Sequence, residues 1–125
     1  MTKAEEAKEV KPKRYWMIGP ILGVQRLNMA SFVKGAVHIE LFGFEAVSPL
    51  RDKQLCSMAV KLSRKGANRG DFLKYIERKL YVMATCDGVY LLPYWADHYE
   101  SQIELLTALQ CGMETFLDED EEEAD

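Results

Sequence analysis

Cys86-Asp-Gly-Val-Tyr-Leu-Leu-Pro93 is the stretch from which the fold can be read most directly. Residues 89–92 form a compact apolar run, and Gly88 and Pro93 bound it as turn residues usually bound a strand. A strand without polar alternation suits the middle of a parallel sheet, where both faces are covered. We therefore predict a central parallel strand at 89–92.

The segments on both sides of this strand alternate between strand and helix patterns. Strands are predicted at 15–18, 44–47, 89–92 and, as an edge strand, 114–117, and helices at 28–41, 55–64, 72–85 and 101–110. Alternation of this kind implies a parallel sheet with helices on both faces. The expected fold is a three-layer flavodoxin-like or Rossmann-like α/β domain with a parallel sheet of about four to five strands.

Two of the predicted helices carry start signals. Asn28 is expected to begin the helix at 28–41, and Asp71 is expected to cap the helix at 72–85. In the first of these helices, apolar side chains recur at steps of three and four residues and predict one buried face. Those side chains are Met29, Phe32, Val33, Ala36 and Val37.

The charge of the chain is unevenly distributed. The net charge of −4 hides a tail in which seven of the last eight residues are acidic, whereas residues 15–117 hold 11 bases and 10 acids. We expect a flexible N-terminal segment at 1–13, one folded domain at 14–117 and a disordered acidic tail at 118–125. The nearly neutral domain argues against nucleic-acid binding. The tail is either solubilising or a contact for a basic partner.

Several classes of protein are disfavoured by composition. Cys56, Cys86 and Cys111 are far apart and form no zinc-type cluster or disulfide framework, which suggests a reducing compartment. No apolar run approaches the roughly 20 residues needed to span a bilayer. Residues 1–14 lack the apolar stretch of a signal peptide. We therefore expect a cytoplasmic protein without a membrane segment or a metal site.

Ligands of parallel sheets bind beyond the carboxyl ends of the strands, which directs attention to two loops. The first is Gly19-Pro20-Ile21-Leu22-Gly23, whose backbone amides either approach a phosphate or sugar or form a plain turn. The second is 93–100. There Trp95 and Tyr99 either stack on a base or pin the loop, and His98 is a candidate general acid.

Two acidic residues are candidates for chemistry. Glu104 lies near the start of the last predicted helix, where a carboxylate is stabilised and could attack an anomeric carbon. The same residue completes a capping box, Ser101-Gln-Ile-Glu104, in which it only returns a hydrogen bond to the helix start. Spacing alone favours the capping box. Asp87 either hydrogen-bonds a ligand, caps the preceding helix or makes a turn.

An ordered set of motifs extends over residues 14–117. They are Tyr15-Trp-Met-Ile-Gly-Pro20, Asn28 with Phe32, Phe44-Glu-Ala-Val-Ser-Pro49, Cys86-Asp-Gly-Val-Tyr-Leu-Leu-Pro93, Trp95, and Glu104 with Ala108. The set resembles the nucleoside 2-deoxyribosyltransferase-like superfamily. It is most similar to a small branch of uncharacterised, often phage- or prophage-borne domains (DUF4406).

The resemblance implies a flavodoxin-like homo-oligomer that cleaves N-glycosidic bonds of a nucleoside or nucleotide without a metal or organic cofactor. Glu104 matches the position of the nucleophile, and Asp87 matches an Asp that positions or protonates the base. Tyr15 matches a Tyr of the first strand, with Trp16 competing at an offset of one residue. The substrate-binding residues so implied are Tyr15, Gly19, Pro20, Asn28, Trp95, His98 and Ser101.

Some positions depart from the pattern of this branch. They are Tyr94 in place of Gly, His98 in place of Ser, Glu100-Ser101 in place of Gly-Ala, and Lys79 in place of an Asp. Gly-Ala would let the backbone approach a sugar or phosphate, whereas Glu100 adds bulk and negative charge where a 5′-phosphate would sit.

Two hypotheses follow. The first is N-glycosidic bond cleavage or transfer on a nucleoside or deoxynucleotide, with Glu104 as nucleophile. The second is a non-catalytic domain that binds or sequesters a nucleotide or contacts another protein, as a phage effector would.

Overall fold

The computed structural model describes residues 11–65 and 68–118. Its four strands form one sheet: β1 (Arg14–Ile18), β2 (Glu45–Val47), β3 (Gly88–Leu91) and β4 (Glu114–Leu117). All neighbouring strands are parallel, and their order is β2-β1-β3-β4. The predictions of a central strand in the apolar run and of an edge strand at 114–117 are therefore confirmed.

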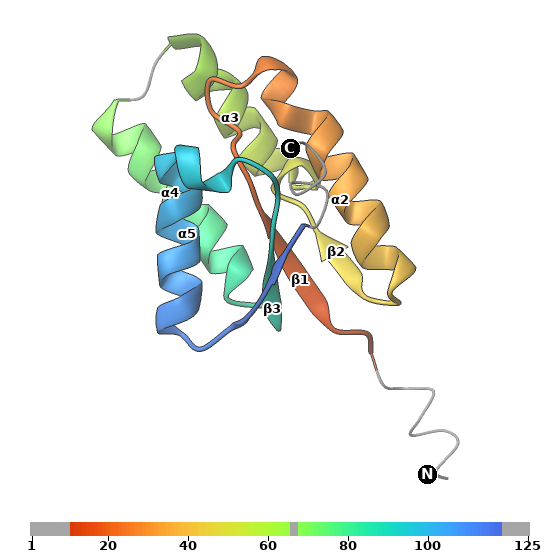
Figure 1. Ribbon diagram of the computed structural model, residues 1–125. Coiled ribbons are helices and arrows are strands. Elements are labelled where there is room, and N and C mark those ends of the chain that lie inside the picture. The colour runs from red at the N-terminus through yellow and green to blue at the C-terminus, as the bar shows by residue number, and fades with distance from the viewer. Residues whose placement is uncertain (1–10, 66–67, 119–125) are drawn as a thin grey trace, which may run out of the picture.

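Helices cover both faces of this sheet. The α-helices of the described ranges are α2 (Met29–Leu41), α3 (Lys53–Lys65), α4 (Arg69–Met83) and α5 (Tyr99–Gln110). Short 3₁₀ helices, η1 (Gln25–Asn28), η2 (Pro49–Arg51) and η3 (Trp95–Asp97), interrupt the loops. Figure 1 shows α2 on one side of the sheet and α4 and α5 on the other, and α3 packs against α4. The chain is a three-layer, Rossmann-like α/β domain, as predicted.

The strand order determines where this fold can hold a site. From β1 the chain winds outward through α2 to β2, and from β3 it winds outward through α5 to β4 on the other face. The loops that follow β1 and β3 therefore diverge at the carboxyl edge of the sheet. Residues 19–24 and 92–98 form that edge, so the two loops singled out in the sequence are neighbours.

Alternation along β1 sends its two aromatic side chains to different faces. The Tyr15 ring lies on the α2 face, edge-on to Phe44 and Phe116 with ring centroids 5.0 and 5.2 Å away. Tyr15 pairs with Gly88, and a Cβ on that glycine would lie 2.6 Å from the Tyr15 ring. Trp16 points to the opposite face and hydrogen-bonds to α5. Of the two residues that compete for the tyrosine position, Trp16 is therefore the one that faces the last helix.

One predicted helix cap, Asn28, is confirmed in position only, and the other, Asp71, is wrong. Asn28 has a left-handed φ of 58° and makes no side-chain capping hydrogen bond, and α2 begins at Met29. An N-cap side chain reaches the helix amides from extended backbone, which Asn28 does not adopt. In α4 the cap is Asn68, whose Oδ1 accepts the Asp71 N–H at 2.9 Å. The helix therefore starts at Arg69, earlier than predicted.

The predicted buried face of α2 is only partly correct. The buried residues of this helix are Phe32, Gly35, Ala36 and Ile39. Met29, Val33 and Val37, which were expected on the same face, are 49–59% exposed. The cause is Gly35, because a Cβ there would lie 2.5 Å from the Leu92 side chain. The helix turns Gly35 and Ala36, flanked by Phe32 and Ile39, to the sheet and leaves several large apolar residues outside.

The folded part of the chain extends one residue further than predicted. Asp118 is 2% exposed, and its N–H donates to the Leu91 carbonyl at 2.9 Å, so it continues from β4. The rest of the predicted acidic tail, 119–125, and residues 1–10 of the predicted N-terminal segment lie outside the described residues.

Candidate functional site

Five side chains meet between the sheet and the α4–α5 layer. They come from β1, α4 and α5, and each is at most 5% exposed. We call them the buried acid cluster: Trp16, Tyr75, Lys79, Glu100 and Glu104. One ammonium and two carboxylates in such a place need explanation, because charged groups are rarely buried without pairing.

Glu104 is held from two sides. Its Oε1 accepts a hydrogen bond from Trp16 Nε1 at 2.7 Å, and its Oε2 lies 2.8 Å from Lys79 Nζ. Oε2 accepts no hydrogen bond of good geometry from the described residues, so its contact with the ammonium is an ion pair only. The side chain has no exposed surface. Glu104 is thus oriented into the domain.

Glu100 accepts four hydrogen bonds from two parts of the chain. Its Oε1 accepts the backbone N–H groups of Ile21 and Leu22 at 2.7 and 2.8 Å. Its Oε2 accepts the Tyr75 hydroxyl at 2.9 Å and Lys79 Nζ at 3.1 Å. The loop after β1 therefore does present amides to an oxyanion, and within the described chain that oxyanion is the carboxylate of Glu100.

The pKa values of the two carboxyls shift in opposite directions, although burial acts to raise both. Burial raises the pKa of Glu104, and the charge of Lys79 and the Trp16 hydrogen bond offset this only in part. Burial also acts to raise the pKa of Glu100, but Lys79, the Leu22 and Ile21 amides and Tyr75 outweigh it and lower that pKa. Negative charge therefore concentrates on Glu100, and Glu104 is the carboxyl that takes up a proton more readily.

The basic and phenolic members are fixed in their ordinary protonation states. Burial alone would lower the pKa of Lys79, but the charges of Glu104 and Glu100 raise it, so the ammonium stays protonated. Burial and the charge of Glu100 raise the pKa of Tyr75, which keeps its proton to donate to Glu100. Lys79 also lies 4.8 Å from the Tyr75 ring centroid.

The capping box predicted at the start of α5 is wrong. The helix begins at Tyr99 with His98 as N-cap, so Ser101 lies inside the first turn. Glu104 contacts Trp16 and Lys79 instead of returning to the helix start. Ser101 Oγ is buried and has no hydrogen-bond partner among the described residues.

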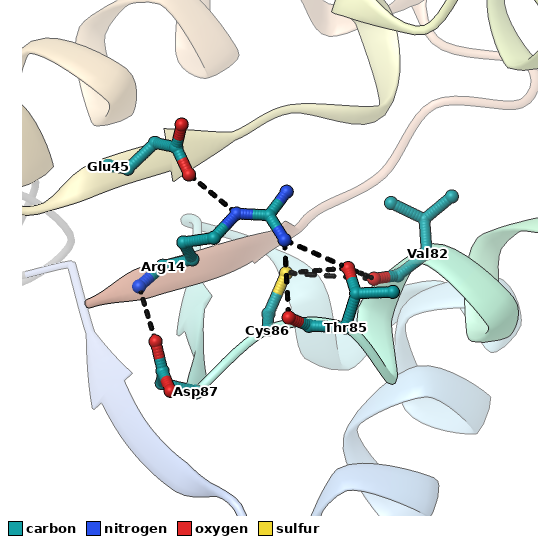
Figure 2. A network of polar contacts seen from close by, with 6 residues as sticks. All are labelled: Arg14, Glu45, Val82, Thr85, Cys86 and Asp87. Carbon is teal, nitrogen blue, oxygen red and sulfur yellow. Dashed lines mark hydrogen bonds and ion pairs between the residues drawn. The ribbon is translucent and has the colours of Figure 1, made fainter. Parts of the chain in front are cut away.

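Asp87 is not brought together with Glu104. It precedes β3 at the amino end of the sheet, where its Oδ2 accepts the Arg14 backbone N–H at 2.7 Å. Figure 2 shows this end of the sheet, with the Arg14 guanidinium donating to Glu45 and to the Thr85 carbonyl and hydroxyl. We call Arg14, Glu45, Thr85 and Asp87 the amino-end network.

The remaining predicted residues surround the two loops. Gly19 and Pro20 are buried in the loop after β1, and Asn28 is half-buried at the end of η1. Trp95 packs partly buried against the core, and His98 is half-buried as the N-cap of α5. Among the described residues, the side chains of these five form no hydrogen bond or ion pair with Glu104, whereas Trp16, the alternative to Tyr15, hydrogen-bonds to it.

Sequence reasoning missed Tyr75 and the pairing of Lys79 with Glu100 and Glu104. A signal was present. In α4, Lys79 stands four residues after Tyr75 on the side that also carries the apolar Met83, and in α5 Glu100 and Glu104 stand four residues apart on the side of Ala108. Charges of opposite sign on the apolar sides of two helices predict a buried ion pair if those helices pack together.

Three cavities found on the described part of the chain are lined by no residue of the buried acid cluster. Cavities of about 650 and 360 Å³ lie along α3 and between α3 and α4. A third, of about 540 Å³, lies on the α2 face and is lined by aromatic residues that include Tyr15, Phe44 and Phe116. Within 11–65 and 68–118 no group of three His, Cys, Asp or Glu side chains could hold a metal. No helix of these ranges has the length and apolarity to cross a membrane.

Comparisons with known proteins identify the family. No curated protein and no solved structure matches the chain. One family model matches residues 13–116, which run from just before β1 through all but the last residue of β4, and its description is a domain of unknown function (DUF4406). The chain therefore belongs to the DUF4406 family.

Proposed function

We propose that this chain is a non-catalytic relative of the nucleoside 2-deoxyribosyltransferase-like enzymes and serves as an interaction domain that associates with a second copy of itself. The observation that carries the first part is the complete burial of Glu104 between Trp16 and Lys79. The observation that carries the second part is the uncovered apolar surface of α2.

A glycosidic nucleophile must be ionised and must reach the anomeric carbon. Reacting atoms have to approach within about 3–3.5 Å, and Glu104 has no exposed surface for such an approach. Burial raises the pKa of Glu104, which lowers the share of ionised, nucleophilic carboxylate at any given pH. The position of the nucleophile is retained, but the side chain serves the interior of the domain.

The α2 face has the features of a contact surface. Large apolar side chains are exposed along this helix at four-residue steps, and Phe42 follows them. These residues are Met29, Val33, Val37 and Leu41. The aromatic cavity of about 540 Å³ adjoins the end of the same helix. Contiguous apolar patches on soluble domains usually mark interaction sites.

A second copy is the partner that fits this surface best. α2 packs on β1 and β2, and on the same face Phe116 of β4, beside Tyr15, remains 41% exposed. Doubly wound sheets normally have both faces covered. The β4 edge of the sheet needs an apolar helix surface to cover it on this face. The exposed face of α2 from another copy is such a surface. A two-fold pair would satisfy both surfaces with the same residues.

Self-association is tested by measuring molar mass by light scattering over a range of concentrations. We expect the wild type to dimerise and V33E/V37E to remain monomeric with an unchanged circular dichroism spectrum, because the charges would be desolvated in the contact. L106E, on an exposed site of α5, is the matched control and should dimerise. A monomeric wild type, or dimers in V33E/V37E, would refute the α2 contact.

N-glycosidic cleavage remains the second candidate, because carboxyls with oppositely shifted pKa values near a topological switch point are typical of acid–base sites. The test is release of free base from a panel of nucleosides and deoxynucleotides, followed by chromatography. We expect no release from the wild type. Release that is lost in E104Q would replace our proposal with an enzyme that uses Glu104.

A further inference from the structure

Glu100 satisfies a set of donors that would otherwise form an empty anion site. We propose that the amides of Ile21 and Leu22, the Tyr75 hydroxyl and Lys79 Nζ constitute an oxyanion-binding site, and that Glu100 occupies it as a built-in ligand. The group it replaces is a small oxyanion of the carboxylate or phosphate class.

The convergence of the donors supports a site built for an oxyanion. Two come from consecutive backbone amides of the loop after β1, and two come from side chains one turn apart on α4. Successive amides that point to one place form an anion-binding concavity. All four donor–acceptor distances lie between 2.7 and 3.1 Å, and the two amide contacts have the short lengths typical of hydrogen bonds to a charged acceptor.

Charge balance supports the same interpretation. Without Glu100, the ammonium of Lys79 would be paired with Glu104 alone at 2.8 Å. A bound monoanion would then restore the charge that the cluster has in the wild type. The donors from the loop and from Tyr75 would otherwise remain buried without acceptors, which is costly.

The position of Glu100 within the cluster indicates the route by which an anion would enter. Glu100 is 5% exposed, whereas Trp16, Tyr75, Lys79 and Glu104 have no exposed surface. It is also the second residue of α5, next to the loop on which the helix begins. Removal of its side chain therefore opens the outermost place in the cluster and leaves the deeper members paired.

The test is chemical rescue of E100A in the full-length chain. We expect its melting temperature to lie below that of the wild type and to rise saturably with sodium formate or inorganic phosphate. At an anion concentration about 100-fold above Kd, the gain should be on the order of 10 °C. The anion that gives the larger gain identifies the ligand class. Sodium chloride at equal ionic strength controls for screening.

Three further proteins make the result specific. The wild type should not respond, because its site is occupied. E100Q should not respond, because its amide fills the space without charge. E100A/Y75F should respond with weaker affinity, because one donor is lost. If E100A is unfolded in buffer, recovery of its native circular dichroism spectrum during refolding in formate or phosphate replaces the melting measurement.

Failure of both oxyanions to stabilise or refold E100A would overturn the proposal, as would an equal response of the wild type. The site lies on the opposite face of the sheet from the exposed residues of α2, so this result is independent of whether the chain dimerises.

Discussion

The two ends of the sheet carry the same set of charges in opposite surroundings. In the amino-end network, the Arg14 guanidinium pairs with Glu45 and the Arg14 backbone N–H donates to Asp87, and the paired Arg14 and Glu45 side chains are 39% and 52% exposed. In the buried acid cluster, Lys79 contacts the carboxylates of Glu100 and Glu104, and none of these side chains exceeds 5%. Each network places one basic residue beside two acids, and the two differ in burial and in whether the cation itself contacts the second acid.

Burial turns a weak surface interaction into a constraint on the whole domain. An exposed ion pair contributes about 0–1 kcal/mol because water solvates both partners when they separate. In the buried cluster each group depends on the others, since removal of one leaves an uncompensated charge inside. The same composition can therefore be dispensable at one end of the sheet and required at the other.

The largest expected effect is the removal of the buried cation. K79M leaves two carboxylates without a counter-charge and should lower the free energy of unfolding by about 3–5 kcal/mol. Urea unfolding followed by circular dichroism measures this loss. K74M makes the same chemical change on an exposed site of α4 and should alter stability by less than about 0.5 kcal/mol. Equal losses in the two variants would mean that the ammonium does not compensate the cluster.

An intermediate effect concerns the pH dependence of stability. Because the pKa of Glu104 is higher in the folded protein than in the unfolded chain, the folded state binds more protons between the two values. Stability then falls as the pH rises from the ordinary glutamate value of about 4.3 through the raised value. The lowered pKa of Glu100 acts oppositely: its contribution is present above about pH 4.3 and is lost as the pH falls.

E104Q separates these two contributions. The decline of stability above about pH 4.3 should become shallower by at most about 1.4 kcal/mol per pH unit, while the loss at acid pH remains. Urea unfolding at a series of pH values measures both limbs, with E45Q at the exposed end as control. An unchanged slope above pH 4.3 in E104Q would show that Glu104 does not titrate in this range.

The smallest expected effect is at the amino end. E45Q removes the exposed partner of Arg14 and should change the free energy of unfolding by less than about 1 kcal/mol. Any difference in the free energy of unfolding between E45Q and the wild type should disappear in high salt, because exposed charges are screened. A larger loss that persists in salt would remove the contrast between the two ends of the sheet.

The sequence predicted best what depends on local pattern. The apolar run at 89–92 has one compatible environment, a buried parallel strand, and the structure places β3 there. It predicted poorly what depends on a neighbour distant in the chain. The buried side of α2 was misassigned because Gly35 sets how closely the helix approaches Leu92, and no helical periodicity encodes that distance.

The candidate site shows the same contrast between features set by local sequence and features set by residues distant in the chain. The loop after β1 could be predicted to present amides to an oxyanion, but the oxyanion itself, Glu100, comes from a helix 78 residues further on. The orientation of Glu104 likewise depends on Lys79, which lies on another helix. The capping box had correct local spacing, yet a buried ammonium competes more strongly for the carboxylate than the helix start does.

The place of Glu100 at the outer edge of the cluster has a consequence for how such a domain evolves. Both glutamate codons become alanine or glycine codons by a change of the second base, so the filled and vacant forms of the oxyanion site are adjacent in genetic terms. Loss of Lys79 before Glu100 would instead pass through an intermediate with two unpaired buried acids. A lineage can therefore exchange the built-in carboxylate for a free anion easily, but only while the lysine is kept.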